Sequence, residues 1–430
     1  MTADRRSLLK WGLAGLAALP AIRRAAASGP AGGDESPDLS GFAEREDEPF
    51  WEAVRRCFRF DPGVVYLNDG SLGPTPLPVL KDLAVFAADL AGSPSEKMWG
   101  PLGARLEAVR KSLAGLVGVP PEDLALTRNT TEGVGTVALG LGLKPGDEVI
   151  TTDQEHPGGA GAWQYLETLG ILRTQVALPL PPDPPDLLLE RLEKALSSRT
   201  RVLALPHMTY GTGHLLPLRE IAALACARSA LLCVDGAHPP GMLPVDVAAL
   251  GCDTYASSSH KWLLAPPGTG LLVVRDGARA RIAPRLFTGT GFTQPSARRY
   301  DDFGTRNLAE VLAQGSAAEF HRRIGPERAA RRIRSLSAHL RNGLLALPRV
   351  QILTPAAPGA SGGLTAFRVE GIPQDAVAAA LARRAHFVVR PVPELDAIRI
   401  STGLHNSFAD LDLFLGALRE VARSNSPGKL

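Results

Sequence analysis

Two stretches decide the fold: Val234-Asp235-Gly236-Ala237-His238 and, further along the chain, Ser257-Ser258-Ser259-His260-Lys261-Trp262. Asp235 closes an apolar run that predicts a strand, and Lys261 comes just after the next predicted strand. In a parallel sheet, residues that follow neighbouring strands meet at the same carboxyl edge. A carboxylate in such a place is costly unless it faces a cation. We therefore expect Asp235 and Lys261 to lie in one crevice.

Short apolar runs alternate with helix-like stretches around this region. Such an alternation predicts an α/β fold whose mostly parallel central sheet carries helices on both faces. The predicted strands are Leu124–Thr127, Glu148–Thr152, Ile171–Val176, Arg201–Leu205, Leu231–Val234, Asp253–Ser257 and Gly270–Arg275. The predicted helices are Glu132–Leu141, Ala160–Leu169, Leu187–Leu196 and Leu218–Arg228.

Beyond Asn307 the pattern changes. A long helical stretch through Leu347, followed by short strands and two more helices, predicts a smaller C-terminal α+β domain. We place an N-terminal arm and the large domain at 49–306 and the small domain at 307–430. The other predicted elements are strands Gln351–Leu353, Thr365–Val369, Phe387–Val389 and Ile398–Ser401 and helices Gln374–Ala385 and Asp410–Ala422.

The composition is that of a globular protein, with 45% hydrophobic and 21% charged residues over 430 positions, and it excludes disordered, fibrous and integral membrane chains. The net charge is +3, and the excess of positive charge lies in residues 1–27. An arginine-rich run from Arg322 to Arg334 is either a phosphate-binding stripe or a solvated helix face. The apolar residues in the same stretch are spaced for burial on one side of a helix, which favours the solvated face for the arginines. We expect no nucleic-acid partner.

Residues 1–27 have the pattern of a bacterial signal peptide. Arg5-Arg6 precedes Leu8-Leu9-Lys10 and a short uncharged run, and Ala25-Ala26-Ala27 offers a cleavage site, which fits the twin-arginine variant. The apolar run is shorter than the ~20 residues of a membrane-spanning helix, so we expect no stable membrane span. A basic amphipathic helix is the alternative. We expect a flexible spacer at 28–48 and export by the twin-arginine machinery to the periplasm or the cell exterior.

The four cysteines, Cys57, Cys226, Cys233 and Cys252, form no Cys-x-x-Cys pair. The sequence therefore predicts no zinc or dithiol site, and we expect no metal. Cys226 and Cys233 lie in apolar contexts, which favour buried free thiols over a disulfide framework.

A lysine and a carboxylate in one crevice are typical of a site for pyridoxal phosphate (PLP). Lys261 would form a Schiff base with the aldehyde, and Asp235 would keep the ring nitrogen protonated so that the ring withdraws electrons. Thr127-Arg128-Asn129-Thr130-Thr131-Glu132-Gly133 runs from a strand end into a helix start, where a phosphate binds well. In Thr152-Asp153-Gln154-Glu155-His156-Pro157, His156 is either a ring that stacks on the cofactor or a polar loop residue.

Longer motifs extend this pattern. They are Tyr66-Leu67-Asn68-Asp69-Gly70-Ser71-Leu72-Gly73, the run from Asp235 to Asp246, His260-Lys261-Trp262-Leu263-Leu264-Ala265-Pro266, Gly304-Thr305-Arg306-Asn307 and Arg399-Ile400-Ser401. Because of these motifs, residues 60–425 resemble the class V aminotransferase family of fold-type I PLP-dependent enzymes. The resemblance is greatest to its isopenicillin N epimerase-like branch, and it implies a homodimer with shared active sites.

The resemblance also implies roles for individual residues. Lys261 would carry PLP, Asp235 would pair with its ring nitrogen, His238 would bond its phenolic oxygen and His156 would stack on its ring. Thr130, Thr131, Ser258 and His260 would hold the phosphate, and Thr290 would reach the phosphate bound by the partner subunit. Arg399 would bind the substrate carboxylate. Tyr210 and His207 are candidates for lining the pocket, and Arg306 and Arg390 are weaker candidates for substrate contact.

The expected reaction is abstraction of the α-proton of an amino acid or small peptide amine, with Lys261 as the base. Epimerisation and transamination both begin in this way, and elimination by a C–S or other lyase is the alternative. Relatives that desulfurate cysteine carry a nucleophilic cysteine on a C-terminal loop, where this chain has Arg390-Pro391-Val392-Pro393-Glu394-Leu395. They also carry an asparagine where this chain has Tyr210. A catalytically silent exported binding protein of the same fold is the other hypothesis.

Overall fold

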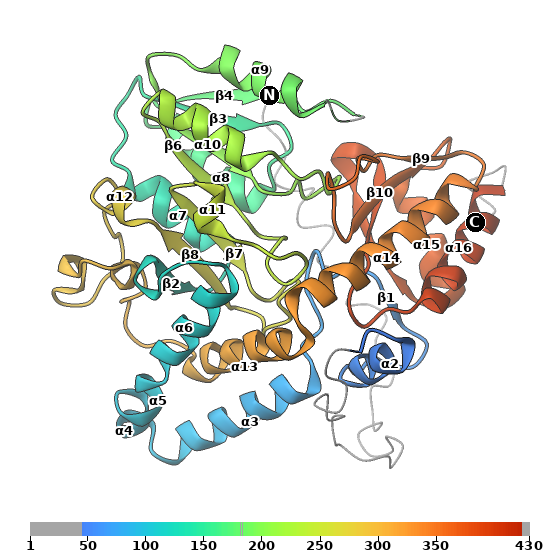
Figure 1. Ribbon diagram of the computed structural model, residues 1–430, viewed down its shortest axis with the longest axis horizontal. Coiled ribbons are helices and arrows are strands. Elements are labelled where there is room, and N and C mark those ends of the chain that lie inside the picture. The colour runs from blue at the N-terminus through green and yellow to red at the C-terminus, as the bar shows by residue number, and fades with distance from the viewer. Residues whose placement is uncertain (1–44, 181, 183, 424–430) are drawn as a thin grey trace, which may run out of the picture. The chain divides into compact units, whose positions relative to one another are not determined.

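The computed structural model describes residues 45–180, 182 and 184–423 (Figure 1). The predicted signal peptide and residues 28–44 of the predicted spacer lie outside the described residues. Of that spacer, residues 45–48 are described, and Asp47 caps helix α2 (Glu48–Arg56). Arg331 and Arg332 pair with Glu46 and Glu48, so two cations of the arginine-rich run are held by carboxylates.

A seven-stranded sheet forms the larger part of the fold, as predicted, with strand order β2-β8-β7-β6-β5-β3-β4. Five neighbouring strands, from β7 to β4, are parallel, and β8 runs antiparallel to both of its neighbours. The strands are β2 Leu124–Thr127, β3 Glu148–Thr152, β4 Leu172–Val176, β5 Thr200–Pro206, β6 Leu231–Asp235, β7 Thr254–Ser258 and β8 Gly270–Val274.

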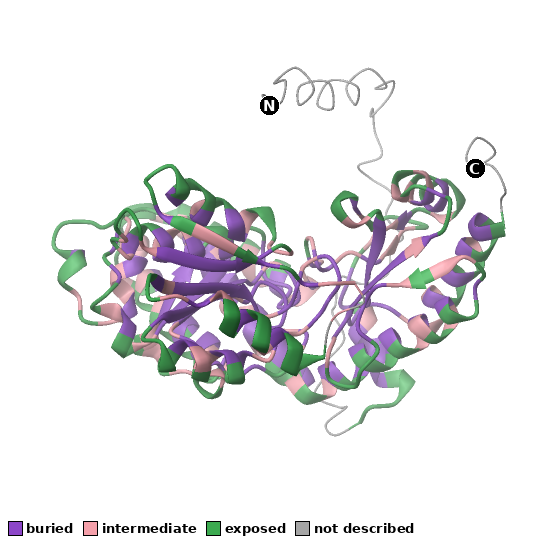
Figure 2. Cartoon of the chain, turned by 90° about the horizontal axis from the view of Figure 1, so that it is seen from above, coloured by how far each residue is buried: buried purple, intermediate pink, exposed green. Residues whose placement is uncertain are grey.

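In the buried strands, successive residues enter different cores, because side chains alternate across a sheet. Ala125 packs with α7 (Thr130–Gly140) and α8 (Pro157–Glu167), whereas Leu124 and Leu126 pack into the core of the opposite face. That face is covered by α9 (Pro185–Ala195), α10 (Leu218–Ala227) and helices from elsewhere in the chain. Figure 2 shows the buried strands between helices whose outer faces are exposed.

Several elements differ from the predicted ones. The helices α3 (Leu77–Gly92), α4 (Pro94–Met98), α5 (Pro101–Ala104) and α6 (Leu106–Leu116) were not predicted. The long helical stretch is two helices, α13 (Leu308–Ile324) and α14 (Pro326–Leu345), because Gly325 has a φ of 89° and Pro326 starts a new helix. The helix α13 packs against α3 and α6, in the core of the large sheet.

A four-stranded antiparallel sheet, in the order β12-β13-β10-β9, forms the C-terminal part. It carries α14, α15 (Gln374–Ala385) and α16 (Phe408–Arg423), and has its own core. Its strands are β9 Val350–Ile352, β10 Leu364–Val369, β12 Arg390–Val392 and β13 Ala397–Ser401. The predicted strand at Phe387–Val389 is β11 (Phe387–Val388), which pairs instead with β1 (Val65–Tyr66). The remaining short helices are α11 (Val247–Leu250) and α12 (Asp276–Arg279).

Within the described residues, no helix combines the length and the apolar character needed to cross a bilayer. The same residues contain no cluster of three or more histidine, cysteine or acidic side chains arranged for a metal ion. All four cysteines are free thiols. Cys233 is buried as predicted, but the prediction for Cys226 was wrong, because Cys226 lies on the exposed face of α10.

Candidate active site

Lys261 lies in the loop that follows β7, and this loop is fastened from several sides. The backbone N–H of Ser259 donates to the carbonyl of Thr269, and Gln314 of α13 donates from Nε2 to Ser259 Oγ at 2.7 Å. The N-terminal arm approaches so closely at Gly73 that a Cβ there would lie 1.9 Å from the carbonyl oxygen of Lys261. The lysine is consequently held in place, with only 8% of it exposed.

Asp235 ends β6 and lies within electrostatic reach of Lys261. Its Oδ1 accepts from the backbone N–H of Ala237 at 3.0 Å. Burial raises the pKa of the Asp235 carboxyl, and the nearby Lys261 amine partly opposes that rise. Burial also lowers the pKa of the Lys261 amine to about 8, with Asp235 opposing this shift and Arg399 adding to it. The predicted juxtaposition of the two groups is present.

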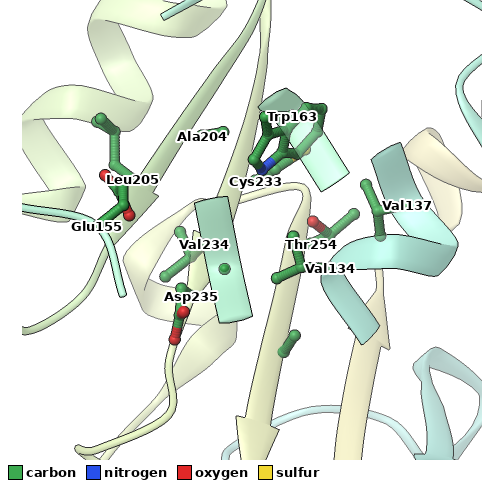
Figure 3. A pocket seen from close by; sticks show the side chains of 12 residues that line it. Val134, Val137, Glu155, Trp163, Ala204, Leu205, Cys233, Val234, Asp235 and Thr254 are labelled. Atoms are coloured by element: carbon green, nitrogen blue, oxygen red, sulfur yellow. The ribbon is translucent and has the colours of Figure 1, made fainter. Parts of the chain in front are cut away.

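A narrow pocket borders Asp235, and Figure 3 shows it from close by. The first turn of α8 passes so near that a Cβ on Gly159 would lie 2.5 Å from Asp235 Oδ2. Glu155 enters the same cavity, and its carboxylate accepts from the backbone N–H and the hydroxyl of Thr152. Burial raises the pKa of Glu155 to about 8, and Asp235 adds to that shift. A second buried carboxyl with a raised pKa therefore lies near Asp235.

His238 follows Asp235 and is 2% exposed. Its Nδ1 lies 3.3 Å from the indole nitrogen of Trp262, which donates to it. Its Nε2 is buried and has no hydrogen-bond partner among the described residues. Burial, together with the positive charges of Lys261 and Arg399 and the nearby His156 ring, lowers the pKa of His238 well below its usual range, so the ring is neutral.

The residues predicted for a phosphate lie at the start of α7. Ser258 Oγ accepts from the backbone N–H of Thr130 at 3.0 Å and lies 2.8 Å from Thr130 Oγ1. Thr131 Oγ1 borders the start of α8, where a Cβ on Gly158 would come within 2.5 Å of it. His260 is turned to the carbonyl of Thr269, 3.1 Å from its Nδ1. The helix start thus combines backbone N–H groups with hydroxyls, as an anion site needs.

His156 caps α8 and accepts from the N–H of Gly158 through Nδ1 at 3.0 Å. Burial and the positive charges of Lys261 and Arg399 lower its pKa to about 4, so the ring is neutral. The ring of Tyr210 meets it edge-on, with centroids 5.1 Å apart.

Arg399 is buried on β13 and reaches back to the large sheet and the N-terminal arm. Its Nη1 donates to the carbonyl of Tyr210 at 2.8 Å, and its Nη2 donates to Ser71 Oγ at 3.0 Å. Its Nε is buried and has no partner among the described residues. Arg390 is opposite Arg399 in the β12–β13 register. The structure therefore brings Arg399, Tyr210 and His156 together beside Lys261.

Three candidates lie elsewhere. The guanidinium of Arg306 donates to the carbonyls of Leu126 and Asp301, and no described contact joins it to Lys261 or Arg399. Thr290 is exposed on the loop between β8 and α13. His207 lies behind Asp235, where its N–H donates to the carbonyl of Asp235 and its ring nitrogen Nδ1 lies 3.0 Å from the hydroxyl of Tyr255. The roles of these three residues stay predictions.

Three contributions to the site were not predicted from the sequence. They are those of Glu155, of Gln314, and of Trp262 as the hydrogen-bond partner of His238. Each acts through a contact between segments that are distant in the chain, so no local pattern could reveal it. The one available signal was the position of Glu155 and Trp262 next to predicted site residues.

These residues fit PLP. The buried Nε2 of His238 lacks a partner, the amine of Lys261 and the carboxyl of Asp235 are buried together, and the start of α7 offers hydrogen-bond donors. A buried donor without an acceptor is costly, and the phenolic oxygen of PLP would accept from His238.

Comparison with known proteins shows the family. The sequence profile of the family described as "Aminotransferase class-V" matches residues 65–414. The chain belongs to the class V aminotransferase family. An isopenicillin N epimerase of Streptomyces clavuligerus is 34% identical, covering 86% of this chain and 97% of that protein. A probable cysteine desulfurase of Methanothermobacter thermautotrophicus is 25% identical, covering 86% and 98%.

Solved structures show the same fold. The cystine C-S lyase C-DES, in complex with its product cysteine persulfide, is 27% identical with a TM-score of 0.75, covering 83% of this chain and 97% of that one. An apo cysteine desulfurase of Thermococcus onnurineus is 25% identical with a TM-score of 0.77, covering 86% and 98%. A C-DES mutant holds glycine covalently linked to its PLP cofactor. This class V aminotransferase family member is a PLP-dependent enzyme, and PLP is its cofactor.

Proposed function

We propose that this class V enzyme removes the α-proton of an amino acid or small peptide amine and then epimerises or transaminates it. The observation that carries the proposal is that Lys261 and Asp235 are both buried and within electrostatic reach of each other, with Arg399 also within electrostatic reach of Lys261. The 34% identity to isopenicillin N epimerase supports this direction, because that relative is named for epimerisation.

PLP, when bound, supplies an electron sink for the negative charge that develops at the substrate α-carbon. The chain's own residues move the proton and hold the substrate. Burial brings the pKa of Lys261 to about 8, close to the range in which an amine both accepts and returns a proton at neutral pH. His156 is neutral and within electrostatic reach of Lys261, and the ring of Tyr210 meets His156 edge-on.

Arg399 orients the substrate. Its Nη1 and Nη2 are engaged by Tyr210 and Ser71, which fixes the guanidinium plane, and the unpartnered Nε stays available to a carboxylate. A charge-assisted hydrogen bond from a fixed guanidinium sets the direction of the α-carbon.

A screen of L- and D-amino acids with the holoenzyme tests the proposal. It reads exchange of the α-proton with solvent and, separately, amine transfer to added keto acids. We expect α-proton exchange, with inversion for an epimerase or amine transfer for an aminotransferase. Bound PLP with no exchange on any substrate would contradict the proposal and favour a catalytically silent binding protein.

The second candidate is a β-eliminating C–S lyase, supported by the likeness to C-DES. Elimination needs the same first proton transfer, and it would appear in the screen as release of a thiol or persulfide and a keto acid. Desulfuration through a cysteine nucleophile is not proposed, because β12 and the residues after it contain no cysteine. Burial also raises the pKa of Cys233 and of Cys252 to about 12, so both are neutral thiols.

We also propose a homodimer. An apolar surface, made of Trp99, Leu286, Phe287 and Phe292, borders two hollows that share Thr305 and Arg306. Trp99 is 75% exposed, which is unusual for so large an apolar side chain. Thr290 lies on the same loop as the phenylalanines, so a second copy seated here would bring this threonine to its neighbour.

We also propose that the protein is exported by the twin-arginine route, on the basis of the sequence of residues 1–27. A fusion of these residues to a reporter should be translocated, and replacing Arg5 and Arg6 by lysine should stop translocation. Unchanged translocation of the double variant would overturn the twin-arginine route.

A further inference from the structure

The indole of Trp262 is a hydrogen-bond donor and cannot accept. It lies 3.3 Å from Nδ1 of His238, so this nitrogen must be the acceptor. The His238 ring is neutral, because burial and the positive charges of Lys261 and Arg399 disfavour the imidazolium. A neutral imidazole carries one proton, and that proton is therefore on Nε2.

The Nε2–H group of His238 is buried and has no partner among the described residues. Such a donor is costly unless a ligand atom accepts from it. Only Gly236 and Ala237 separate His238 from Asp235 in the turn after β6, and both Asp235 and His238 are within electrostatic reach of Lys261. The ligand of this site is PLP, and its ring oxygen is an acceptor of the required kind.

We propose that Trp262 is a positioning residue, which holds His238 in its Nε2–H tautomer so that His238 donates a hydrogen bond to the phenolic oxygen of PLP. Without the indole, either nitrogen could carry the proton, and one of the two tautomers would turn a lone pair toward that oxygen. This inference rests on PLP as the cofactor and not on which reaction follows.

The surroundings of Trp262 leave its ring little freedom, as a positioning role requires. The side chain is 2% exposed. A Cβ on Gly363 would lie 2.6 Å from Cη2 of the indole, and a Cβ on Gly241 would lie 2.4 Å from the Trp262 backbone. Because both positions are glycines, the chain at the start of β10 and the turn after β6 pack directly against Trp262.

The test begins with the wild-type holoenzyme labelled with ¹⁵N-histidine, and the His238 signals are assigned by their loss in His238→Gln. We expect a protonated Nε2 and an unprotonated, hydrogen-bonded Nδ1. A protonated Nδ1 in the wild-type protein would overturn the proposal without any Trp262 variant.

The second measurement uses Trp262→Phe, which keeps an aromatic ring and removes the donor. His238 should then populate both tautomers. The donor from His238 draws electron density from the PLP oxygen, so its weakening should raise the pH midpoint of the visible absorbance of lysine-bound PLP by about half to one unit. In a His238→Gln background, Trp262→Phe should no longer move the midpoint.

Trp51→Phe is the matched control. Trp51 is also a buried indole donor, and it bonds the carbonyl of Glu46 in the N-terminal helix region, so its loss should leave the His238 signals and the midpoint unchanged. A loaded, folded Trp262→Phe protein with the wild-type tautomer and midpoint would contradict the proposal.

Discussion

At the residue scale, the decisive property of Lys261 is that burial keeps its amine partly neutral near physiological pH. An amine attacks the PLP aldehyde only in its unprotonated form. The rate at which protein stripped of PLP regains visible absorbance should therefore rise with pH, with a midpoint at about 8, and then level off. An ordinary lysine has a pKa of about 10.4, so a rate that keeps climbing through that range would contradict the buried site.

Arg399 offers a second prediction at this scale. Arg399→Lys keeps the charge, but one ammonium cannot bond Tyr210 and Ser71 in the geometry of the guanidinium while also reaching a substrate. We expect KM for the amino acid found in the screen to rise about 10- to 100-fold. Arg384→Lys, on the surface of α15, is the control and should leave KM unchanged. An unaltered KM in Arg399→Lys would remove this residue from the substrate site.

At the element scale, α13 fixes the loop that carries Lys261. Gln314 donates to Ser259 Oγ and to the carbonyl of Gly270, and Gln314→Leu would leave both acceptors buried without this donor. The free energy of unfolding, measured with denaturant, should fall by about 1–3 kcal/mol. The exposed Gln351 of β9, replaced by leucine, should change it by less than about 0.5 kcal/mol. Equal effects of the two substitutions would show that the contact does not stabilise the loop.

A helix or strand could be predicted where its own residues follow a clear local pattern. Most strands of the large sheet are short runs buried on both faces, such as Leu231–Asp235, so their apolar composition was sufficient, whereas β4 is exposed or half-buried along most of its length. The helix α3 begins among Pro74, Pro76 and Pro78, which resemble a loop although proline is tolerated in the first turn. Pro391 hid β12 in the same way, since an edge strand accepts proline.

The site was predictable to the extent that it lies in turns after strands. Asp235 ends a strand, and Lys261, His238 and His156 lie shortly after strand ends, so their convergence could be inferred from order along the chain. Glu155 and Trp262 depend on contacts between turns, and Gln314 on how a helix packs under the sheet. Packing of that kind depends on contacts between distant segments, which no local pattern in the sequence reveals.

At the scale of the whole molecule, the proposed dimer places the apolar surface around Trp99 and Phe287 between two subunits. Trp99→Glu combined with Phe287→Glu should convert a dimer to a monomer in light scattering, because two charges would be buried unpaired at the interface. Leu345→Glu replaces an equally exposed leucine of α14 outside this surface and should leave the mass unchanged. A wild-type protein that is monomeric at working concentration would contradict the dimer.

One lysine of this chain, Lys261, is expected to carry PLP, and the intact holoenzyme allows this to be tested directly. Reduction of the holoenzyme with borohydride fixes the cofactor to its lysine, and mass spectrometry of the digested protein identifies the modified peptide. We predict that the added mass lies on Lys261 alone. Modification of another lysine, or a reduced protein without the added mass, would contradict the account.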